Sequence, residues 1–174
     1  MAHNSRLLGA LLTLGVLFGC THERADLEAA LAPPVASRFL AHGNCFAGWF
    51  INVDVIVRET RGVDVALESV SLRVEDRTGD LLGEQTVEAD ALRERFGALG
   101  AMVPAHGSLR IPMSVGPLPG SANAPTFTGA IVASGEIVAA DEAGRVRSQY
   151  RIPADVAVDG SPLPTGGACT PGSS

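Results

Sequence analysis

The stretch that decides the fold is Trp49 to Glu59, which reads WFINVDVIVRE. Isoleucine or valine occupies every odd position from 51 to 57, whereas positions 52, 54 and 58 are polar. A period of two is typical of a strand that buries one face and exposes the other to water. The sequence therefore predicts a strand over 49–59.

Similar patterns continue toward the C-terminus. After a turn at Arg61-Gly62, the apolar positions are odd up to 67 and even from 70, so the buried face changes parity near Glu68-Ser69. A β-bulge or a crossover between sheets explains such a change. Further strands are predicted over 81–88, 109–115, 127–139, 146–152 and 156–158.

Proline and one short helical segment complete the pattern. Pro112 favours an edge strand or a strand end. The run Gly116 to Pro125 holds three prolines and is predicted to be a loop. Residues 89–96 (ADALRERF) are predicted to form one short helix, because Leu92 and Phe96 are four residues apart.

About seven strands separated by turns predict an all-β fold, a single antiparallel β-sandwich. The pattern over 45–160 resembles immunoglobulin-like or fibronectin-III-like domains of bacterial surface lipoproteins. The resemblance lies in a first strand, a D-x-x-G turn at Asp76 to Gly79, a Pro/Gly corner before SLRIPM and a closing hairpin. The Cys-Trp-Cys spacing of antibody domains is missing, so an Ig-like sandwich is an expectation from pattern alone.

The N-terminal segment has the pattern of an export signal. Leu7 to Phe18 is an apolar run, shorter than the roughly 20 residues that span a bilayer. It ends in Leu17-Phe18-Gly19-Cys20, which resembles the lipobox of bacterial lipoproteins: Leu at −3, a small residue at −1 and the cysteine. The resemblance implies a signal peptide over 1–19 and a lipid on Cys20. An ordinary secretory signal or an uncleaved anchor is the alternative.

Lipidation would fix where the protein acts. Acyl chains such as palmitate contribute about 0.8 kcal/mol for each buried CH₂, so several chains on Cys20 attach a protein permanently to a membrane. Thr21 rather than Asp follows the cysteine, which in enterobacterial lipoproteins accompanies sorting to the outer membrane. We expect a cell-envelope location, facing the periplasm or the surface. Residues 20–44 are predicted to be a tether, with a short helix at 26–31 that ends before Pro33-Pro34.

If the protein is exported as expected, two further cysteines would lie in an oxidising compartment. Cys45 and Cys169 are therefore expected to form a disulfide that ties the Pro/Gly/Ser-rich tail, 161–174, to the first strand. Closing so long a loop contributes up to about 4 to 5 kcal/mol in the chain-entropy model. A redox role is the alternative, but the chain has no C-x-x-C pair.

Composition indicates a globular domain and argues against nucleic acid as a partner. The chain is 46% apolar and 18% charged, which indicates a globular domain. Its net charge is −6, and removing the leader makes it about −7, so no basic surface for nucleic acid is expected.

Two places in the sequence resemble parts of known metal sites. Met102 and Met113 form M-x10-M, half of the motif of periplasmic copper chaperones, but no His-x-Met follows. Asp76 and Asp80 resemble calcium ligands, although a solvated turn explains them better because the EF-hand pattern is missing. No metal, cofactor or catalytic residues are therefore predicted.

Catalytic motifs are equally weak. The sequence lacks G-x-S-x-G and the glycine-rich nucleotide motifs, and nothing marks His42 or His106 as a base. We therefore expect no enzyme, but a membrane-anchored envelope lipoprotein that acts as a structural or protein-interaction module. Its envelope partner would dock on Gly116 to Pro125 or on the strand around Ile111. A periplasmic copper carrier or ligand-binding protein is the alternative.

Overall fold

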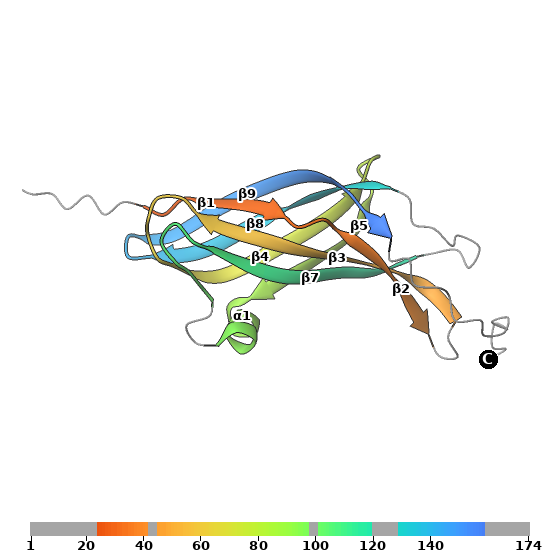
Figure 1. Ribbon diagram of the computed structural model, residues 1–174, viewed down its shortest axis with the longest axis horizontal. Helices are drawn as coiled ribbons and strands as arrows, with labels where there is room; N and C mark the ends of the chain where they lie inside the picture. The colour runs from red at the N-terminus through yellow and green to blue at the C-terminus, as the bar shows by residue number, and fades with distance from the viewer. Residues whose placement is uncertain (1–23, 42–44, 98–100, 120–128, 159–174) are drawn as a thin grey trace, which may run out of the picture.

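The computed structural model describes residues 24–41, 45–97, 101–119 and 129–158, as ten strands and one helix (Figure 1). In chain order the elements are β1 (Leu27–Leu31), β2 (Val35–Ala41), β3 (Cys45–Glu59), β4 (Val65–Asp76), β5 (Leu81–Glu88), α1 (Ala89–Phe96), β6 (Met102–Val103), β7 (Ser108–Pro119), β8 (Ala130–Asp141), β9 (Gly144–Asp155) and β10 (Ala157–Val158). They form two five-stranded sheets that pack as a sandwich, which confirms the predicted all-β fold.

The fifteen-residue strand β3 organises the first sheet. One edge of β3 pairs antiparallel with β1 along its C-terminal half and with β2 along its N-terminal half, and the other edge pairs with β7. Two residues of β10 add in parallel to β2. The strand predicted over 49–59 is thus confirmed, and it begins four residues earlier.

The second sheet has the order β5-β4-β8-β9, and β6 pairs with β4 beyond the end of β5. All of its pairs are antiparallel. The register between β4 and β8 shifts between Leu67 and Ser69, where the apolar pattern changes parity. The bulge predicted near Glu68-Ser69 is confirmed.

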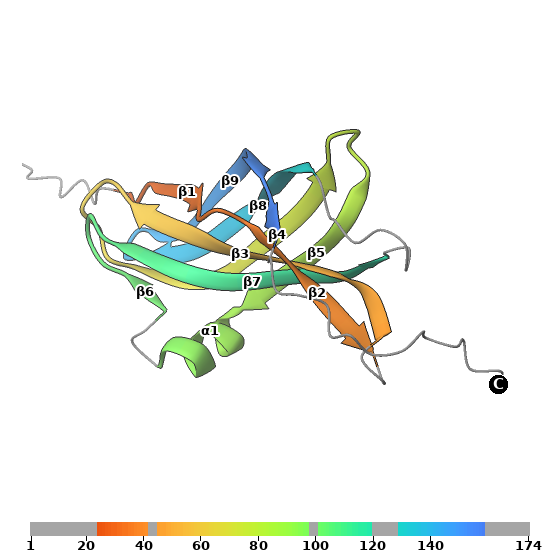
Figure 2. The same ribbon diagram turned by 45° about the vertical axis from the view of Figure 1, so that its right-hand side comes forward.

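The core lies between the two sheets and receives one face of each long strand. Inward-facing side chains that are fully buried come from both sheets and include Ile51, Val55, Leu72, Ile111, Ile131 and Ile137. Each contributes about 1.5–3 kcal/mol when it leaves water. The helix α1, at the predicted residues, lies beside β4 and β5 and buries Leu92 completely (Figure 2).

The sandwich begins at Leu27 rather than at Cys45, so the predicted tether over 20–44 is wrong from Leu27 onward. Residues 26–31 form no helix: β1 alternates buried and exposed side chains, and Leu27 is only 3% exposed. Without β1 and β2, one edge of the long strand β3 would lack main-chain partners, and pairing outweighs the helix propensity of an Ala-rich segment. Pro33-Pro34 separates the two short strands.

The loop predicted from Gly116 is also wrong in part, because β7 continues to Pro119. Among the described elements β7 pairs only with β3, so it is an edge strand, as Pro112 indicated. Prolines are tolerated there because one side of an edge strand makes no ladder hydrogen bonds. Residues 120–125 lie outside the described ranges.

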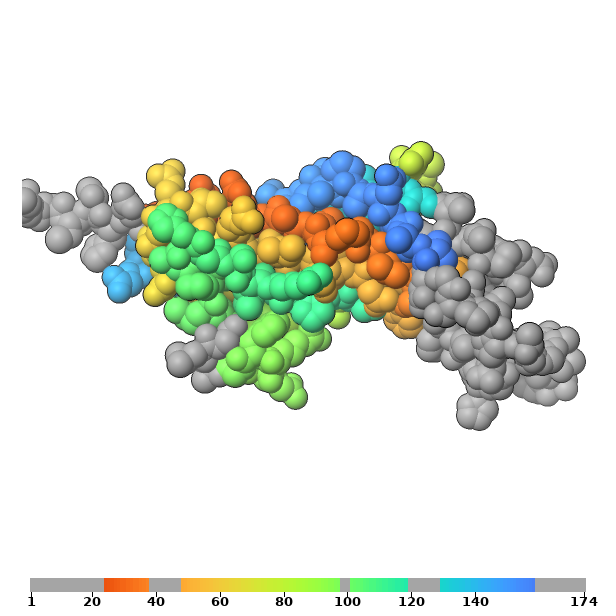
Figure 3. Space-filling model, in the orientation of Figure 1, coloured from red at the N-terminus to blue at the C-terminus, as the bar shows by residue number. Residues whose placement is uncertain are grey.

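The two sheets also meet along both open sides of the sandwich. On one side β1 lies along β9, where the Ser148 hydroxyl donates a 2.6 Å hydrogen bond to the Leu27 carbonyl (Figure 3). On the other side the Gln85 amide oxygen of β5 accepts a 2.7 Å bond from the Ser114 N–H of β7. The Arg95 side chain of α1 donates to the Pro112 carbonyl at 3.0 Å. Side chains thus form hydrogen bonds with main-chain groups of β1 and β7 that face away from the neighbouring strand β3.

Candidate functional site

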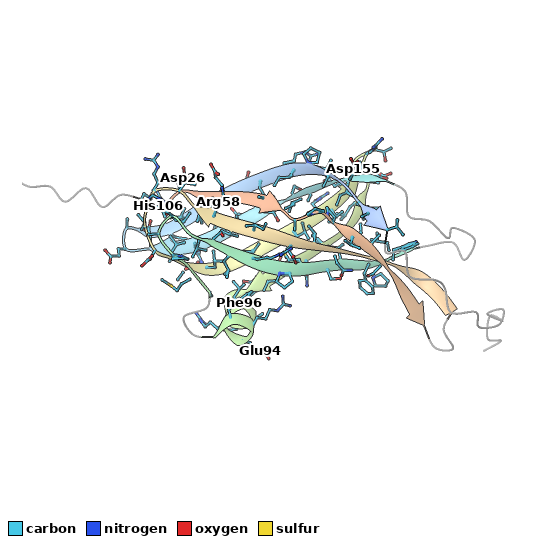
Figure 4. The ribbon with its side chains drawn as sticks, viewed as in Figure 1. Asp26, Arg58, Glu94, Phe96, His106 and Asp155 are labelled. Carbon is cyan, nitrogen blue, oxygen red and sulfur yellow. The ribbon has the colours of Figure 1, made fainter. Side chains whose placement is uncertain are left out.

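The end of the sandwich where β1 begins gathers several turns and charged residues. We call it the proximal end; it comprises Arg24–Asp26, the 60–64 loop after β3, the 104–107 turn before β7 and the 142–143 turn between β8 and β9. Figure 4 places Asp26, Arg58 and His106 together at this end, and Asp155 at the opposite one.

The first described residues are fixed to this end by hydrogen bonds. The Arg24 side chain donates to the Arg145 carbonyl at 2.7 Å, and the Ala25 N–H donates to the Asp141 carboxylate at 2.8 Å. The Thr60 N–H donates to the Asp26 carbonyl at 3.1 Å. Ala25 is only 6% exposed. Residues 24–26 are therefore part of the folded domain.

A buried carboxylate, Glu59, holds the proximal end together. Its side chain is 1% exposed, and its Oε1 accepts from the Arg61 N–H at 2.7 Å and the Asp26 N–H at 3.5 Å. Its Oε2 accepts from the N–H groups of Gly62, Val63 and His106, at 2.7, 3.2 and 3.1 Å. One side chain thereby joins the N-terminal segment, the 60–64 loop and the 104–107 turn.

The electrostatics of Glu59 follow from these donors. Burial alone would raise its pKa, but the N–H donors of His106, Arg61, Gly62 and Val63 outweigh burial and lower the pKa to about 2. A carboxylate that is buried, ionised and saturated with donors is not a general acid or base near neutral pH. Glu59 is a structural clamp.

Two other carboxylates act in the same way. The Ala25 N–H lowers the pKa of Asp141, and the Ala143 N–H supports the same ion from the next turn. At the opposite end, the Thr78 hydroxyl and the Asp80 N–H donate to Asp76 and lower its pKa. Asp76 therefore caps the turn between β4 and β5. The sequence pattern explains Asp76 and Asp80 as parts of a solvated turn rather than as calcium ligands.

A local opening in the second sheet lies where β4 meets β8. Pairing is regular at Val70 and again at Arg73, and between them the Ser71 hydroxyl accepts from the Glu136 N–H at 2.8 Å. The Tyr150 hydroxyl donates to the Ser71 carbonyl at 2.6 Å. A Cβ at Gly135 would collide with this carbonyl oxygen. Burial raises the pKa of Tyr150, so its hydroxyl keeps the proton that it donates.

Over this opening, the outer face of the second sheet carries a shallow polar depression. It is open to solvent and is lined by side chains that include Ser71, Arg73, Thr86, Ser134 and Gln149. Beside it, Glu75 accepts from Arg73 at 3.0 Å and from Arg151 at 3.2 Å. Exposed pairs of this kind contribute roughly 0–1 kcal/mol each. The depression has the chemistry of a solvated sheet face rather than of a catalytic centre.

The sequence-predicted site residues lie apart from these features or outside the described ranges. Cys20 and Cys169 are outside, as is His42. Cys45 begins β3. His106 is exposed, with a left-handed backbone (φ 55°), and its N–H is the group that binds Glu59. The pairing of Cys45 with Cys169 and the lipidation of Cys20 remain predictions.

The candidate metal residues have ordinary structural positions. Met113 is 3% exposed in the core, whereas Met102 is half-buried on β6. Within the described ranges, no group of three or more His, Cys, Asp or Glu side chains is arranged to hold a metal ion.

Sequence reasoning missed Glu59 and the contact of Ser71 with Tyr150. The first had a visible signal, because Glu59 continues the odd-numbered series of inward positions that begins at Ile51. A carboxylate at such a position requires hydrogen-bond donors. The second had none, since Ser71 and Tyr150 meet only through the order of β4, β8 and β9.

Among the described residues, no helix has the length and apolar character needed to cross a membrane.

No family model and no curated protein matches the sequence. Similar solved structures include a putative ApaA protein from Bordetella pertussis, at 13% identity over 76% of this chain and 94% of that chain, with a TM-score of 0.48. An X-ray structure of a structural genomics target has 8% identity over 76% and 86%, with a TM-score of 0.45. Spo0M, a sporulation control protein from Bacillus subtilis, has 11% identity over 76% and 49%, with a TM-score of 0.32. At these values the likeness carries no argument about function.

Proposed function

We propose that this chain is a lipid-anchored module of the bacterial cell envelope, attached through Cys20, whose sandwich is a structural or protein-interaction domain. The observation that carries the proposal is the lipobox-like Leu17-Phe18-Gly19-Cys20, which stands a few residues ahead of Arg24 and Ala25, both hydrogen-bonded to the sandwich. A motif of this kind gives a domain a membrane address and no chemistry of its own.

The chemistry of the described residues supports a binding or structural role over catalysis. The carboxylate of Glu59 is buried and saturated by main-chain donors. Asp76 and Asp141 are likewise engaged with main-chain N–H groups of their own turns. Titratable groups used in this way stabilise loops, and loops held on a rigid sandwich are common protein-recognition surfaces.

Metabolic labelling tests the anchor. The full-length chain, expressed in a bacterial host with an alkyne analogue of palmitate, is expected to take up the label and to sediment with membranes. Cys20→Ser is expected to lose both properties, whereas Cys45→Ser, the matched control, keeps them. Equal labelling of the wild-type and Cys20→Ser chains would refute the proposal.

The same preparation tests the envelope partner. A pull-down from detergent-solubilised membranes is expected to recover a protein with the wild-type chain, but not with Cys20→Ser, which never reaches the membrane. Recovery of nothing above this control would leave only the structural role.

We also propose the disulfide between Cys45 and Cys169. Cys45 begins β3, whose edge pairs with β2, so the bond would tie the C-terminal tail to the first sheet. Mass spectrometry of the unreduced protein after alkylation is expected to show both thiols unmodified by the reagent. Alkylation of both cysteines without reductant would exclude the bond.

A further inference from the structure

We infer that the proximal end of the sandwich faces the lipid headgroups, and that the domain stands on the membrane with its opposite, distal end pointing away. The distal end comprises the 77–80 turn between β4 and β5 and the start of β3. This inference rests on the proposed lipidation of Cys20 and adds an orientation to it.

The first argument is the reach of the anchor. Only three residues lie between Cys20 and Arg24, so these two Cα atoms are at most about 14 Å apart even in a fully extended chain. The strands β8 and β9 run the length of the sandwich with twelve residues each, which corresponds to about 40 Å. The anchor therefore reaches the proximal end and not the distal one.

The second argument is rigidity. The side chain of Arg24 and the N–H of Ala25 bind the β8–β9 hairpin at 2.7 and 2.8 Å, and Glu59 clamps the neighbouring loop and turn. The lipid is consequently connected almost directly to the folded domain, and no long flexible linker lets the domain reorient. Because residues 27–41 form strands of the sandwich, little of the predicted tether is left between Cys20 and the folded end.

The third argument is the chemistry of the surface that meets the membrane. The larger exposed side chains of the proximal end are charged or polar and of both signs, including Arg24, Asp26, Arg61, Asp64 and His106, and its exposed apolar side chains, such as those of Ala105 and Ala143, are small. The two exposed large apolar side chains of the described ranges, Val35 and Leu81, are elsewhere, with Leu81 directly after the distal turn. Such an end suits a hydrated headgroup layer rather than the hydrocarbon interior, so the acyl chains supply the binding energy.

The orientation assigns the free surface for a protein partner. The 77–80 turn and the β2–β3 end of the first sheet project away from the proximal end (Figure 1). The 77–80 turn is then accessible from the aqueous compartment while the lipid stays embedded. A partner in solution would meet the distal end first.

Collisional quenching tests the orientation with the full-length lipidated chain. Ala143→Cys places a fluorescent label at the proximal end and Arg77→Cys places one at the distal end; both positions are exposed. Each protein is reconstituted into phosphatidylcholine vesicles that contain a lipid with a nitroxide on its headgroup. The chain without an added cysteine gives the background from Cys45 and Cys169.

Quenching is expected to be several-fold stronger at position 143 than at position 77. A glycine-serine insertion of about ten residues after Thr21 is expected to reduce quenching at position 143, because it lengthens the connection between the lipid and the proximal end. Equal quenching at both positions would overturn the inference, since it would show the sandwich lying flat on the bilayer. Mass spectrometry of the same samples separates the two claims: an unlipidated Cys20 defeats the proposed function, whereas a lipidated Cys20 with equal quenching defeats the orientation alone.

Discussion

The hydroxyl of Tyr150 donates a 2.6 Å hydrogen bond to the main-chain carbonyl of Ser71, through space that a side chain at Gly135 would fill. The three residues belong to three adjacent strands, β4, β8 and β9. Tyr150 therefore replaces a main-chain contact that the opening between β4 and β8 leaves unmade.

Tyr150→Phe removes this bond and keeps the ring. The Ser71 carbonyl then lacks its partner, and we expect a loss of about 1–2 kcal/mol in the free energy of unfolding, because an unsatisfied buried acceptor is costly. Urea denaturation measures the loss. Gln149→Ala, at the exposed neighbouring position, is the control and should change stability by less than about 0.5 kcal/mol. A Phe variant as stable as wild type would show that water replaces the hydroxyl.

Gly135→Ala tests the same opening from the other side. The added Cβ would overlap the Ser71 carbonyl oxygen and lie 2.8 Å from the Tyr150 hydroxyl, so the strands must separate. We expect destabilisation of at least about 1–3 kcal/mol, the usual cost of overpacking. Gly129→Ala is the matched control, since a Cβ there meets nothing within 4 Å. Similar melting temperatures for the two variants would contradict the geometry.

Much of the fold could be predicted because its signals are local. The alternation in β3, the parity change at Glu68-Ser69 and the helix at 89–96 depend on neighbouring residues alone. The strands β1 and β2 could not be predicted in this way, because Ala and Leu between 27 and 31 favour a helix when isolated. They become strands only through pairing with β3, which is a tertiary effect. For the same reason the sequence placed the domain boundary eighteen residues too late.

The candidate site likewise has one part that local sequence indicates and another part that only the tertiary structure provides. The odd-numbered position of Glu59 in β3 marks it from sequence as an inward-facing carboxylate, but its donors at Asp26 and His106 come from distant segments of the chain.

The Glu59→Gln substitution tests the clamp. It replaces one acceptor oxygen with an NH₂ group, whose hydrogens would face the main-chain N–H donors. We expect a loss of about 2–3 kcal/mol at neutral pH, the range for hydrogen bonds to a charged group. Glu94→Gln, exposed on α1, is the control and should be nearly neutral.

The pH dependence of stability should reveal the same clamp. The pKa of Glu59 falls from its usual 4.5 to about 2 on folding, so its stabilisation is complete above about pH 4.5 and is lost as the pH falls toward 2. At 1.36 kcal/mol for each pH unit, the shift contributes roughly 3 kcal/mol at most. Asp76 and Asp141 also have lowered pKa values, but they are present in both wild type and Glu59→Gln. The difference in stability between these two proteins should therefore shrink as the pH falls from about 5 to about 2. A difference that stays constant would mean that the Glu59 charge contributes nothing.

The last prediction concerns the edge of β7. Its Ser114 N–H donates to Gln85 and its Pro112 carbonyl accepts from Arg95, so side chains from β5 and α1 occupy groups that would otherwise be open to another strand. Exposed edges of this kind pair with other chains. The double variant Gln85→Ala/Arg95→Ala should therefore self-associate in a concentration-dependent way, as measured by light scattering after size exclusion.

Arg93→Ala is the control, because Arg93 lies on the same helix and its side chain pairs with Asp90, one turn away on that helix. It removes a charge from α1 without uncovering β7, and should elute like wild type. If both variants associate equally, lost charge and not an open edge is the cause. If neither associates, the prolines of β7 protect the edge without help, since Pro112 has no N–H to offer an incoming strand.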